Sequence, residues 1–170
     1  MREVHELQLA LATTVVADDA AALVYDQRQK SRQKITTQNG VVVGLFLPRG
    51  TILKHGDVLL ADDGSCIRVD AAPEELSVVK SDDHFQLMRA AYHLGNRHVM
   101  LQIAPGQLAY QHDHVLDDML RGLGLNVDCV TAPFHPEAGA YHGQGGHAHE
   151  HEHVDGHDHT HAHVFGHRHR

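Results

Sequence analysis

Short apolar runs alternate with turn residues through the first half of the chain. In GVVVGLFLPRGTILKHGDVLLADDGSCIRVDA, residues 40–71, runs of Val, Leu and Ile are separated by Pro, Gly and Asp-Gly positions. This spacing is typical of consecutive strands joined by tight turns, and no long helical period interrupts it. The pattern changes at AAPEE, residues 71–75, so we predict a β-rich domain over residues 1–75.

The second half alternates between the periods of strands and helices. Strand patterns occur in ELSVVKS (75–81), HVMLQIA (98–104), QLAYQ (107–111) and LNVDCVT (125–131), and helical spacing occurs in DDHFQLMRAAYHLGN (82–96) and DHVLDDMLRGLG (113–124). The order β-α-β-β-α-β is the ferredoxin-like arrangement, in which two helices cover one face of the sheet. We therefore predict an α+β protein whose second domain, residues 76–135, leaves its other sheet face free for a partner.

The helix predicted over residues 82–96 has two apolar stripes. The stripes consist of Phe85, Met88 and Tyr92 on one side and of Leu87, Ala91 and Leu94 beside them. Ser81 is placed to cap the amino end, and Gly95 with Asn96 is placed to close the carboxyl end.

The strand predicted over residues 98–104 places a histidine opposite its core-facing side chains. Val99, Leu101 and Ile103 alternate with polar positions, so His98 is expected to point away from the helices, towards the uncovered sheet face. A single exposed histidine is usually only solvated. If two subunits met there about a twofold axis, however, each His98 would face its copy and one metal ion could bridge them.

His112 and His114 form a His-x-His motif where a strand gives way to a helix, in YQHDHVLDD. Both imidazoles are candidate metal ligands. Asp113 or His114 could equally cap the helix that follows, and the sequence leaves both interpretations open.

Charge and cysteine content narrow the class of protein. Asp and Glu outnumber Lys and Arg by 22 to 14, which argues against a nucleic-acid partner. No apolar run is long enough to span a membrane, and no export signal precedes the first strand, so we expect a cytoplasmic protein. Cys66 and Cys129 are then expected to pack as small apolar residues in strands rather than to form a disulfide.

A basic row lies in QRQKSRQK, where Arg28, Lys30, Arg32 and Lys34 recur at every second position. In an extended strand all four would line one face. Such a row is usually a solvated or edge-protecting face. A docking patch for an acidic partner is the alternative.

The last part of the chain, residues 136–170, is rich in histidine and has no apolar period, so we predict that it is disordered without a ligand. Imidazole is the commonest metal ligand, and its borderline character suits Ni, Cu, Zn and Co. The tail residues predicted to bind metal are His142, His147, His149, His151, His153, His157, His159, His161, His163, His167 and His169. HEHEH also satisfies the zinc-protease pattern, but nearby glycines and the lack of an apolar side argue against the stable helix that this mechanism needs.

These segments together resemble the urease accessory protein E family, the nickel metallochaperones of urease maturation. The resemblance rests on LPRGTILKHGDVLLADDG, AAYHLGNRH, QHDHVLDDMLRGLGLNV and the histidine-rich end, and it covers essentially the whole chain. It implies a cytoplasmic homodimer whose first domain is similar to a co-chaperone's peptide-binding domain and whose second domain binds metal. It also implies delivery of Ni(II) to apo-urease through a complex with the urease accessory GTPase, without enzymatic turnover.

Four histidines of the body match the family's pattern. His98, the last residue of YHLGNRH, matches the metal ligand at the dimer centre. His112 and His114 match additional metal-site histidines of some members, and His93 matches a nearby histidine. Zn(II) or Cu(II) is expected to bind alongside the Ni(II) cargo.

Passive storage or detoxification of transition metals through the tail is the alternative function. In that case the body would be only a scaffold. Single-stranded RNA binding needs exposed aromatic residues and a basic face, which His98, Met100 and Gln102 do not supply. No nucleophile with a base, phosphate loop or acid pair indicates an enzyme.

Overall fold

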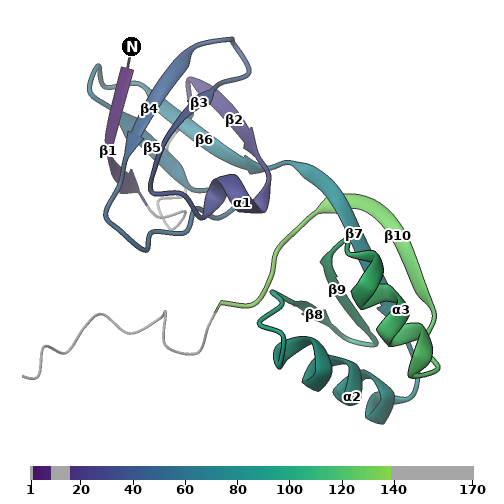
Figure 1. Cartoon of the computed structure of the whole chain (residues 1–170). Coiled ribbons are helices and arrows are strands. Elements are labelled where there is room, and N and C mark those ends of the chain that lie inside the picture. Colours follow the sequence, from purple (N-terminus) through teal and green to yellow (C-terminus); the bar gives the residue numbers. More distant parts are fainter. Residues whose placement is uncertain (1, 9–15, 139–170) are drawn as a thin grey trace, which may run out of the picture. The chain divides into compact units, whose positions relative to one another are not determined.

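The short apolar runs of the first half produce a six-stranded sheet (Figure 1). The computed structural model describes residues 2–8 and 16–138. The elements of this first domain are β1 (Arg2–Gln8), β2 (Asp19–Leu23), α1 (Tyr25–Arg28), β3 (Arg32–Thr36), β4 (Val42–Phe46), β5 (Val58–Ala61) and β6 (Cys66–Ala71). The strands are ordered β2-β6-β5-β1-β4-β3, with β1–β4 and β2–β6 parallel and the other pairs antiparallel.

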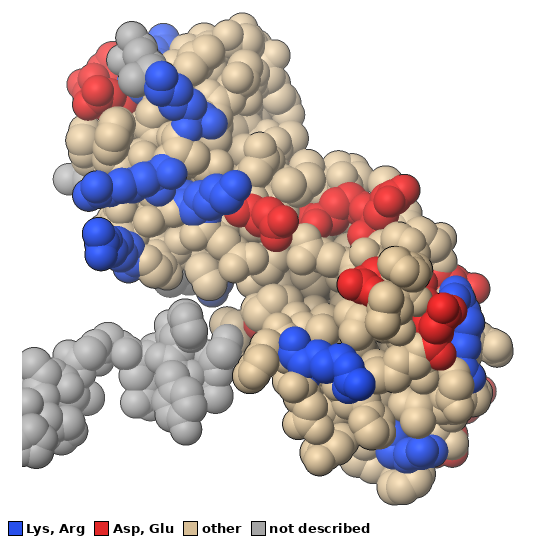
Figure 2. Space-filling model, viewed as in Figure 1, with Lys and Arg blue, Asp and Glu red and all other residues tan. Residues whose placement is uncertain are grey.

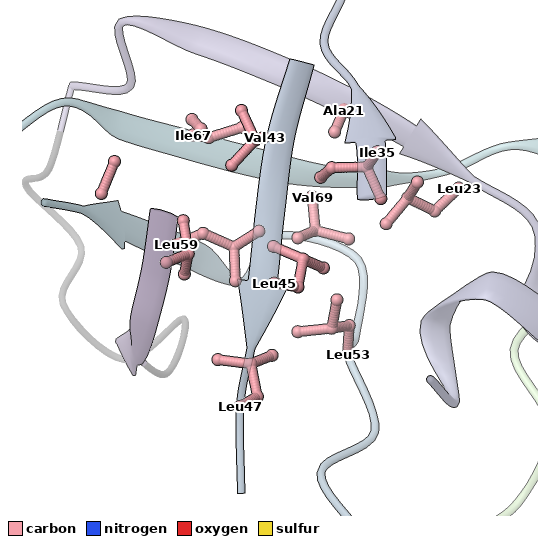
Figure 3. Close-up of a cluster of buried hydrophobic side chains, with 12 residues drawn as sticks. Ala21, Leu23, Ile35, Val43, Leu45, Leu47, Leu53, Leu59, Ile67 and Val69 are labelled. Carbon is pink, nitrogen blue, oxygen red and sulfur yellow. The ribbon is translucent and has the colours of Figure 1, made fainter. Parts of the chain in front are cut away.

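The inward side chains of these strands form the core of the first domain, drawn in Figure 3. Val43 and Leu45 lie on either side of the buried Gly44 on β4, and Ile67 and Val69 alternate with less buried residues on β6, as in a half-buried strand. Gly64 has a φ of 83° in the tight turn between β5 and β6, a left-handed backbone that glycine adopts without strain. The predicted succession of strands and turns is confirmed.

The second half forms a four-stranded antiparallel sheet with two helices. Its elements are β7 (Pro73–Lys80), α2 (His84–Gly95), β8 (Gln102–Ala104), β9 (Gln107–Gln111), α3 (His114–Gly122) and β10 (Val127–Pro133). The order β-α-β-β-α-β is the predicted one, and the strands lie in the order β10-β7-β9-β8. The protein is therefore a strand-rich α+β protein with two domains, as predicted.

Both helices pack on the same face of this second sheet (Figure 1). One core cluster unites the buried side chains of Leu87, Ala90 and Leu94 of α2 and Leu120 of α3 with Val79, Leu108 and Tyr110 of the sheet. Burial of a leucine side chain stabilises a fold by about 1.5–3 kcal/mol, so this cluster fixes how both helices lie on the sheet.

An aspartate caps each of these helices at its amino end. The Asp83 carboxylate accepts hydrogen bonds from the backbone N–H groups of Phe85 and Gln86, so the prediction that Ser81 is the cap was wrong. Ser81 lies two residues earlier, where its hydroxyl accepts a hydrogen bond from the N–H of Asp83. Asp113 caps α3.

One apolar stripe of α2 is not in the core. Phe85, Met88 and Tyr92 are 62%, 63% and 66% exposed, whereas Leu87 and Leu94 of the adjoining stripe are buried. The helix touches the sheet along a single line, so only one of the two stripes predicted from the sequence can face it. The other stripe faces outward in the described part of the chain.

The opposite face of the second sheet is less open than predicted. Phe134, just after β10, is fully buried against Leu76 of β7 and Tyr25 of α1. The segment after β10 is also held by backbone N–H groups, since His135 donates to the Gln102 side chain and Glu137 donates to the Leu101 carbonyl. The chain itself therefore covers part of the face that we expected to be free.

The predicted basic row is interrupted, because its first member lies in α1 rather than in a strand. Arg28 is buried and donates a hydrogen bond to the Phe134 carbonyl, while Lys30, Arg32 and Lys34 are exposed. Figure 2 shows Lys and Arg side chains close together on the visible face of the first domain. The prediction of one continuous face was wrong.

Both cysteines lie in strands, as predicted, but their burial differs. Cys66 on β6 is half-buried and Cys129 on β10 is exposed, so the prediction that both pack as buried apolar residues was wrong for Cys129. Among the described residues, no helix combines the length and apolar character needed to cross a bilayer.

Replacing the cap of α2 is expected to destabilise the protein measurably. Asp83→Ala removes the acceptor of two helix N–H groups and should lower the free energy of unfolding by about 1 kcal/mol in a urea titration. Asp82→Ala makes the same change of charge at an exposed position that does not cap the helix, and it should cost clearly less. Equal losses in the two variants would contradict the assignment of the cap.

Candidate metal-binding site

His98 closes α2 in an unusual backbone conformation. Its φ is 57°, and it is the one non-glycine residue with a positive φ in the described part of the chain. The N–H of His98 donates to the Gly95 carbonyl at 2.9 Å, and the N–H of Val99 donates to the Leu94 carbonyl at 3.2 Å. This is the Schellman motif, whose left-handed position usually holds glycine.

The end of α3 shows the same motif with the usual residue. The N–H of Gly124 donates to the Arg121 carbonyl, and the N–H of Leu125 donates to the Leu120 carbonyl. Gly124, with a φ of 86°, occupies the position that His98 occupies after α2. A left-handed backbone costs a residue with a side chain about 1–2 kcal/mol. Helix termination therefore does not account for a histidine after α2, and strain of this kind is a reason to look for a function.

His98 does not lie on the sheet. Strand β8 begins only at Gln102, and His98 is an exposed residue of the turn after α2, so the prediction that it points from a strand to the uncovered sheet face was wrong. Ile103, predicted to be in the core, is 53% exposed. The helix cap takes up residues 96–99 and delays the strand. His98 is nevertheless accessible to a metal ion from solvent.

His93 lies in the last turn of α2, five residues before His98. Its side chain is half-buried, and its ring meets the edge of the exposed Tyr92 ring at a centroid distance of 5.4 Å. Arg97 donates a hydrogen bond to the backbone carbonyl of His93 and reinforces the end of the helix. His93 thus borders the exposed stripe of α2.

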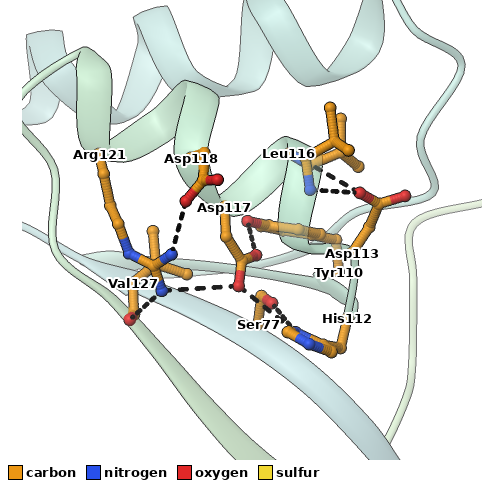
Figure 4. Close-up of polar contacts among 10 residues, drawn as sticks. Ser77, Tyr110, His112, Asp113, Leu116, Asp117, Asp118, Arg121 and Val127 are labelled. Carbon is orange, nitrogen blue, oxygen red and sulfur yellow. Dashed lines mark hydrogen bonds and ion pairs between the residues drawn. The ribbon is translucent and has the colours of Figure 1, made fainter.

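His112 is held by two buried polar side chains (Figure 4). Its Nδ1 lies 3.0 Å from the Ser77 hydroxyl oxygen and 3.3 Å from Oδ2 of Asp117. The same carboxylate accepts a hydrogen bond of 2.7 Å from the Tyr110 hydroxyl and lies 3.7 Å from the Arg121 guanidinium. The His112 side chain itself is 35% exposed.

The Tyr110 hydroxyl stays protonated at neutral pH. Burial is the largest cause that raises the pKa of Tyr110, and its hydrogen bond to Asp117 raises it further. A hydrogen bond with Ser77 acts in the opposite direction and lowers the pKa of this hydroxyl. The phenol therefore donates its hydrogen to Asp117.

The cap of α3 separates His114 from His112. The Asp113 carboxylate accepts hydrogen bonds from the N–H groups of Val115 and Leu116, so Asp113 caps the helix and His114 is its first residue. This answers one question that the sequence left open. The His114 side chain is exposed.

The described residues do not assemble a complete site. Within residues 2–8 and 16–138, no three His, Cys, Asp or Glu side chains are placed to hold one ion together. The eleven tail histidines predicted as ligands, from His142 to His169, lie outside the described residues. The structure therefore presents separate accessible imidazoles on the body and no closed cage.

The partners of His112 were not predicted from the sequence. Ser77 lies on β7 and is cross-strand neighbour to Tyr110 on β9, while Asp117 comes from the first turns of α3. The four-residue spacing of Asp113 and Asp117 places both near the start of one helix, which was the available signal. Only the tertiary packing of α3 on the sheet brings the carboxylate to the ring.

Comparison with known proteins gives one consistent result. The family described as "UreE urease accessory protein, N-terminal domain" matches residues 2–72, and the corresponding C-terminal domain matches residues 74–169. A "Urease accessory protein UreE" of Teredinibacter turnerae is 57% identical over 129 residues, which cover 76% of this chain and 84% of that protein. Proteins of the same name from Alkalilimnicola ehrlichii and Escherichia coli O157:H7 are each 54% identical. The first match covers 79% of this chain and 92% of that protein, and the second covers 78% of this chain and 86% of that protein.

The backbone strain at His98 predicts opposite effects of two glycine exchanges. His98→Gly should raise the free energy of unfolding by about 1 kcal/mol, because glycine adopts a positive φ freely. His98→Ala keeps the Cβ and should give no such gain. Gly124→Ala, where an added Cβ would meet only open space, should lose a similar amount through the backbone alone. Urea unfolding of the metal-free variants measures all three, and a destabilised His98→Gly variant would contradict the strain.

Proposed function

The chain belongs to the UreE family of urease accessory proteins, and on this basis we propose that it is a metallochaperone that carries Ni(II) to apo-urease. The family consists of accessory proteins of urease assembly and not of enzymes. We propose that transfer takes place in the cytoplasm within a complex containing the urease accessory GTPase. The observation that carries the proposal is the exposed His98 imidazole at a strained backbone position where glycine would serve folding better.

The chemistry of the available ligands suits a carrier. Neutral imidazole offers a nitrogen lone pair to Ni(II), and Zn(II) and Cu(II) are expected to compete for the same nitrogens. A structural metal site encloses its ion with four protein ligands. Accessible, separate imidazoles such as those of His98, His112 and His114 favour exchange instead, which a protein that must release its cargo requires.

We propose that the principal site is shared by two copies of the chain. The described part of one chain gathers no three ligands, so a second copy would double the donors at His98. Phe85, Met88 and Tyr92 form an exposed apolar stripe on the helix that ends just before His98. A twofold interface sets the same patch against itself, which would bury this stripe and bring the two His98 residues near the axis. His93 borders the stripe and would lie close by.

We assign three segments to this function. Residues 1–75 would form the peptide-binding-like domain, residues 76–135 a metal-binding domain of ferredoxin-like topology, and residues 136–170 a histidine-rich tail that binds metal. The strand order β10-β7-β9-β8 supports the ferredoxin-like assignment. The eleven tail histidines would raise the local concentration of Ni(II) near the body, as tethered ligands do.

Metal titration of four forms of the protein tests this proposal. In calorimetry with Ni(II) at neutral pH, His98→Ala should weaken the tightest site by at least about tenfold, or about 1.4 kcal/mol. A chain ending at Ala138 should keep that site and lose most of the weaker ones. His5→Ala, an exposed histidine of the first domain, is the matched control and should leave the tightest site unchanged.

The outcomes separate the two candidate functions. If the tightest site disappears with the tail and is insensitive to His98→Ala, the protein is a storage protein that acts through its tail. The high histidine content of the tail is the feature that favours this second candidate. Retention of the tightest site in the shortened chain, together with its loss in His98→Ala, supports the chaperone.

The shared site makes a separate prediction about assembly. Met88→Ser places a polar hydroxyl in the exposed stripe and should shift the protein towards monomers in sedimentation velocity, because apolar area is lost from the interface. Phe46→Ser is the control, since Phe46 is 41% exposed on β4 of the other domain. A Met88→Ser protein that sediments like the unmodified chain would refute the assignment of the stripe.

A further inference from the structure

The His112 ring has close polar contacts at only one of its two nitrogens, among the described residues. Both close polar partners, Ser77 and Asp117, approach Nδ1, at 3.0 Å and 3.3 Å. Ser77 and Asp117 are 0% and 3% exposed, whereas the His112 side chain is 35% exposed. The partners of Nδ1 are therefore buried side chains. Figure 4 shows the His112 ring next to the Ser77 and Asp117 side chains.

A count of hydrogens decides which ring nitrogen carries the proton. The Tyr110 hydroxyl donates to Oδ1 of Asp117, and an ionised carboxylate can only accept. The Ser77 hydroxyl can donate or accept a hydrogen bond, so it can accept one from Nδ1 at 3.0 Å. The group that distinguishes the two tautomers is therefore Asp117, whose Oδ2 presents only lone pairs to Nδ1 while Tyr110 donates to the other oxygen of the same carboxylate. This favours a proton on Nδ1 and leaves the lone pair of the neutral ring on Nε2.

We propose that Asp117, supported by Ser77 and Tyr110, is a positioning residue that holds the His112 ring with Nδ1 protonated and Nε2 as the donor to a divalent metal ion. That Nε2 binds a metal ion rests on the proposed function, whereas the protonation of Nδ1 does not. A carboxylate behind a ligating histidine fixes its tautomer and orientation and raises its basicity.

The two histidines of the His-x-His motif are then not equivalent. Among the described residues, the His114 ring has no hydrogen-bonding partner like Asp117, because the Asp113 side chain is occupied by the helix cap. A ring that is already oriented loses less conformational freedom when a metal ion binds. His112 is therefore the stronger ligand of the pair, although spacing alone treats the two alike.

The tautomer can be read without any metal. In the full-length chain labelled with 15N in its histidines, two-dimensional NMR at neutral pH should show His112 as the Nδ1–H tautomer. Asp117→Asn, whose amide can donate to Nδ1, should shift the ring towards the Nε2–H form. Asp118→Asn, an exposed neighbour that also contacts Arg121, removes the same charge and should leave the tautomer unchanged.

The same spectra measure the effect on metal binding. The free Ni(II) concentration that broadens half of the His112 ring signal should rise about 10- to 100-fold in Asp117→Asn and stay the same in Asp118→Asn. His112→Ala should likewise reduce the effect of Ni(II) on this region more than His114→Ala does. Because the His112 signals report only on that ring, binding by the tail does not enter the comparison.

Each result decides one part of the inference. If His112 of the unmodified protein is the Nε2–H tautomer, the inference is overturned, even if Asp117→Asn does not fold. A folded Asp117→Asn protein with an unchanged His112 tautomer and an unchanged response to Ni(II) also overturns it. If His112 is the Nδ1–H tautomer but Ni(II) leaves its signals unchanged, Asp117 positions the ring and His112 is not a ligand of the proposed metal site.

Discussion

The packing of α2 on the second sheet determines where the other side chains of this helix and the turn after it lie. Leu87, Ala90 and Leu94 are buried against the sheet, and that single line of contact fixes the rotation of the helix. Everything else on α2 follows from it. The stripe that includes Tyr92 must face outward, and the turn that closes the helix must carry His98 away from the core.

The left-handed backbone at His98 links this packing to function. The Schellman hydrogen bonds close α2 and return Val99 to the core. This turn requires a positive φ at His98, the residue before Val99. The equivalent turn after α3 meets the same requirement with Gly124. The strained backbone therefore lies at His98, whose exposed imidazole follows α2, the helix that carries the exposed apolar stripe. A rigid helix end positions a ligand more precisely than a loop does, and under the proposed function the exposure of His98 would keep a bound ion exchangeable.

The sequence predicted the elements well because their periods are local. The order of strands and helices and the two apolar stripes of α2 follow from spacing and side-chain chemistry within a few residues, whereas the choice of Asp113 over His114 as the cap of α3 came from the structure. What it could not predict depends on tertiary contacts. The exposure of Phe85, the burial of Phe134 and the place of His98 in a turn are set by how much surface the sheet offers. The contact of Asp117 with His112 likewise exists only because α3 packs on the sheet.

We propose that two copies of the folded body hold a single divalent ion between their His98 side chains. Native mass spectrometry of the chain ending at Ala138, loaded with excess Ni(II) and desalted at neutral pH, distinguishes this arrangement from binding by single chains. We expect a dimer that retains one Ni(II), and the same dimer without metal when His98 is replaced by Ala. A dimer without nickel in the unmodified chain, or one ion retained by each separate monomer, would contradict it.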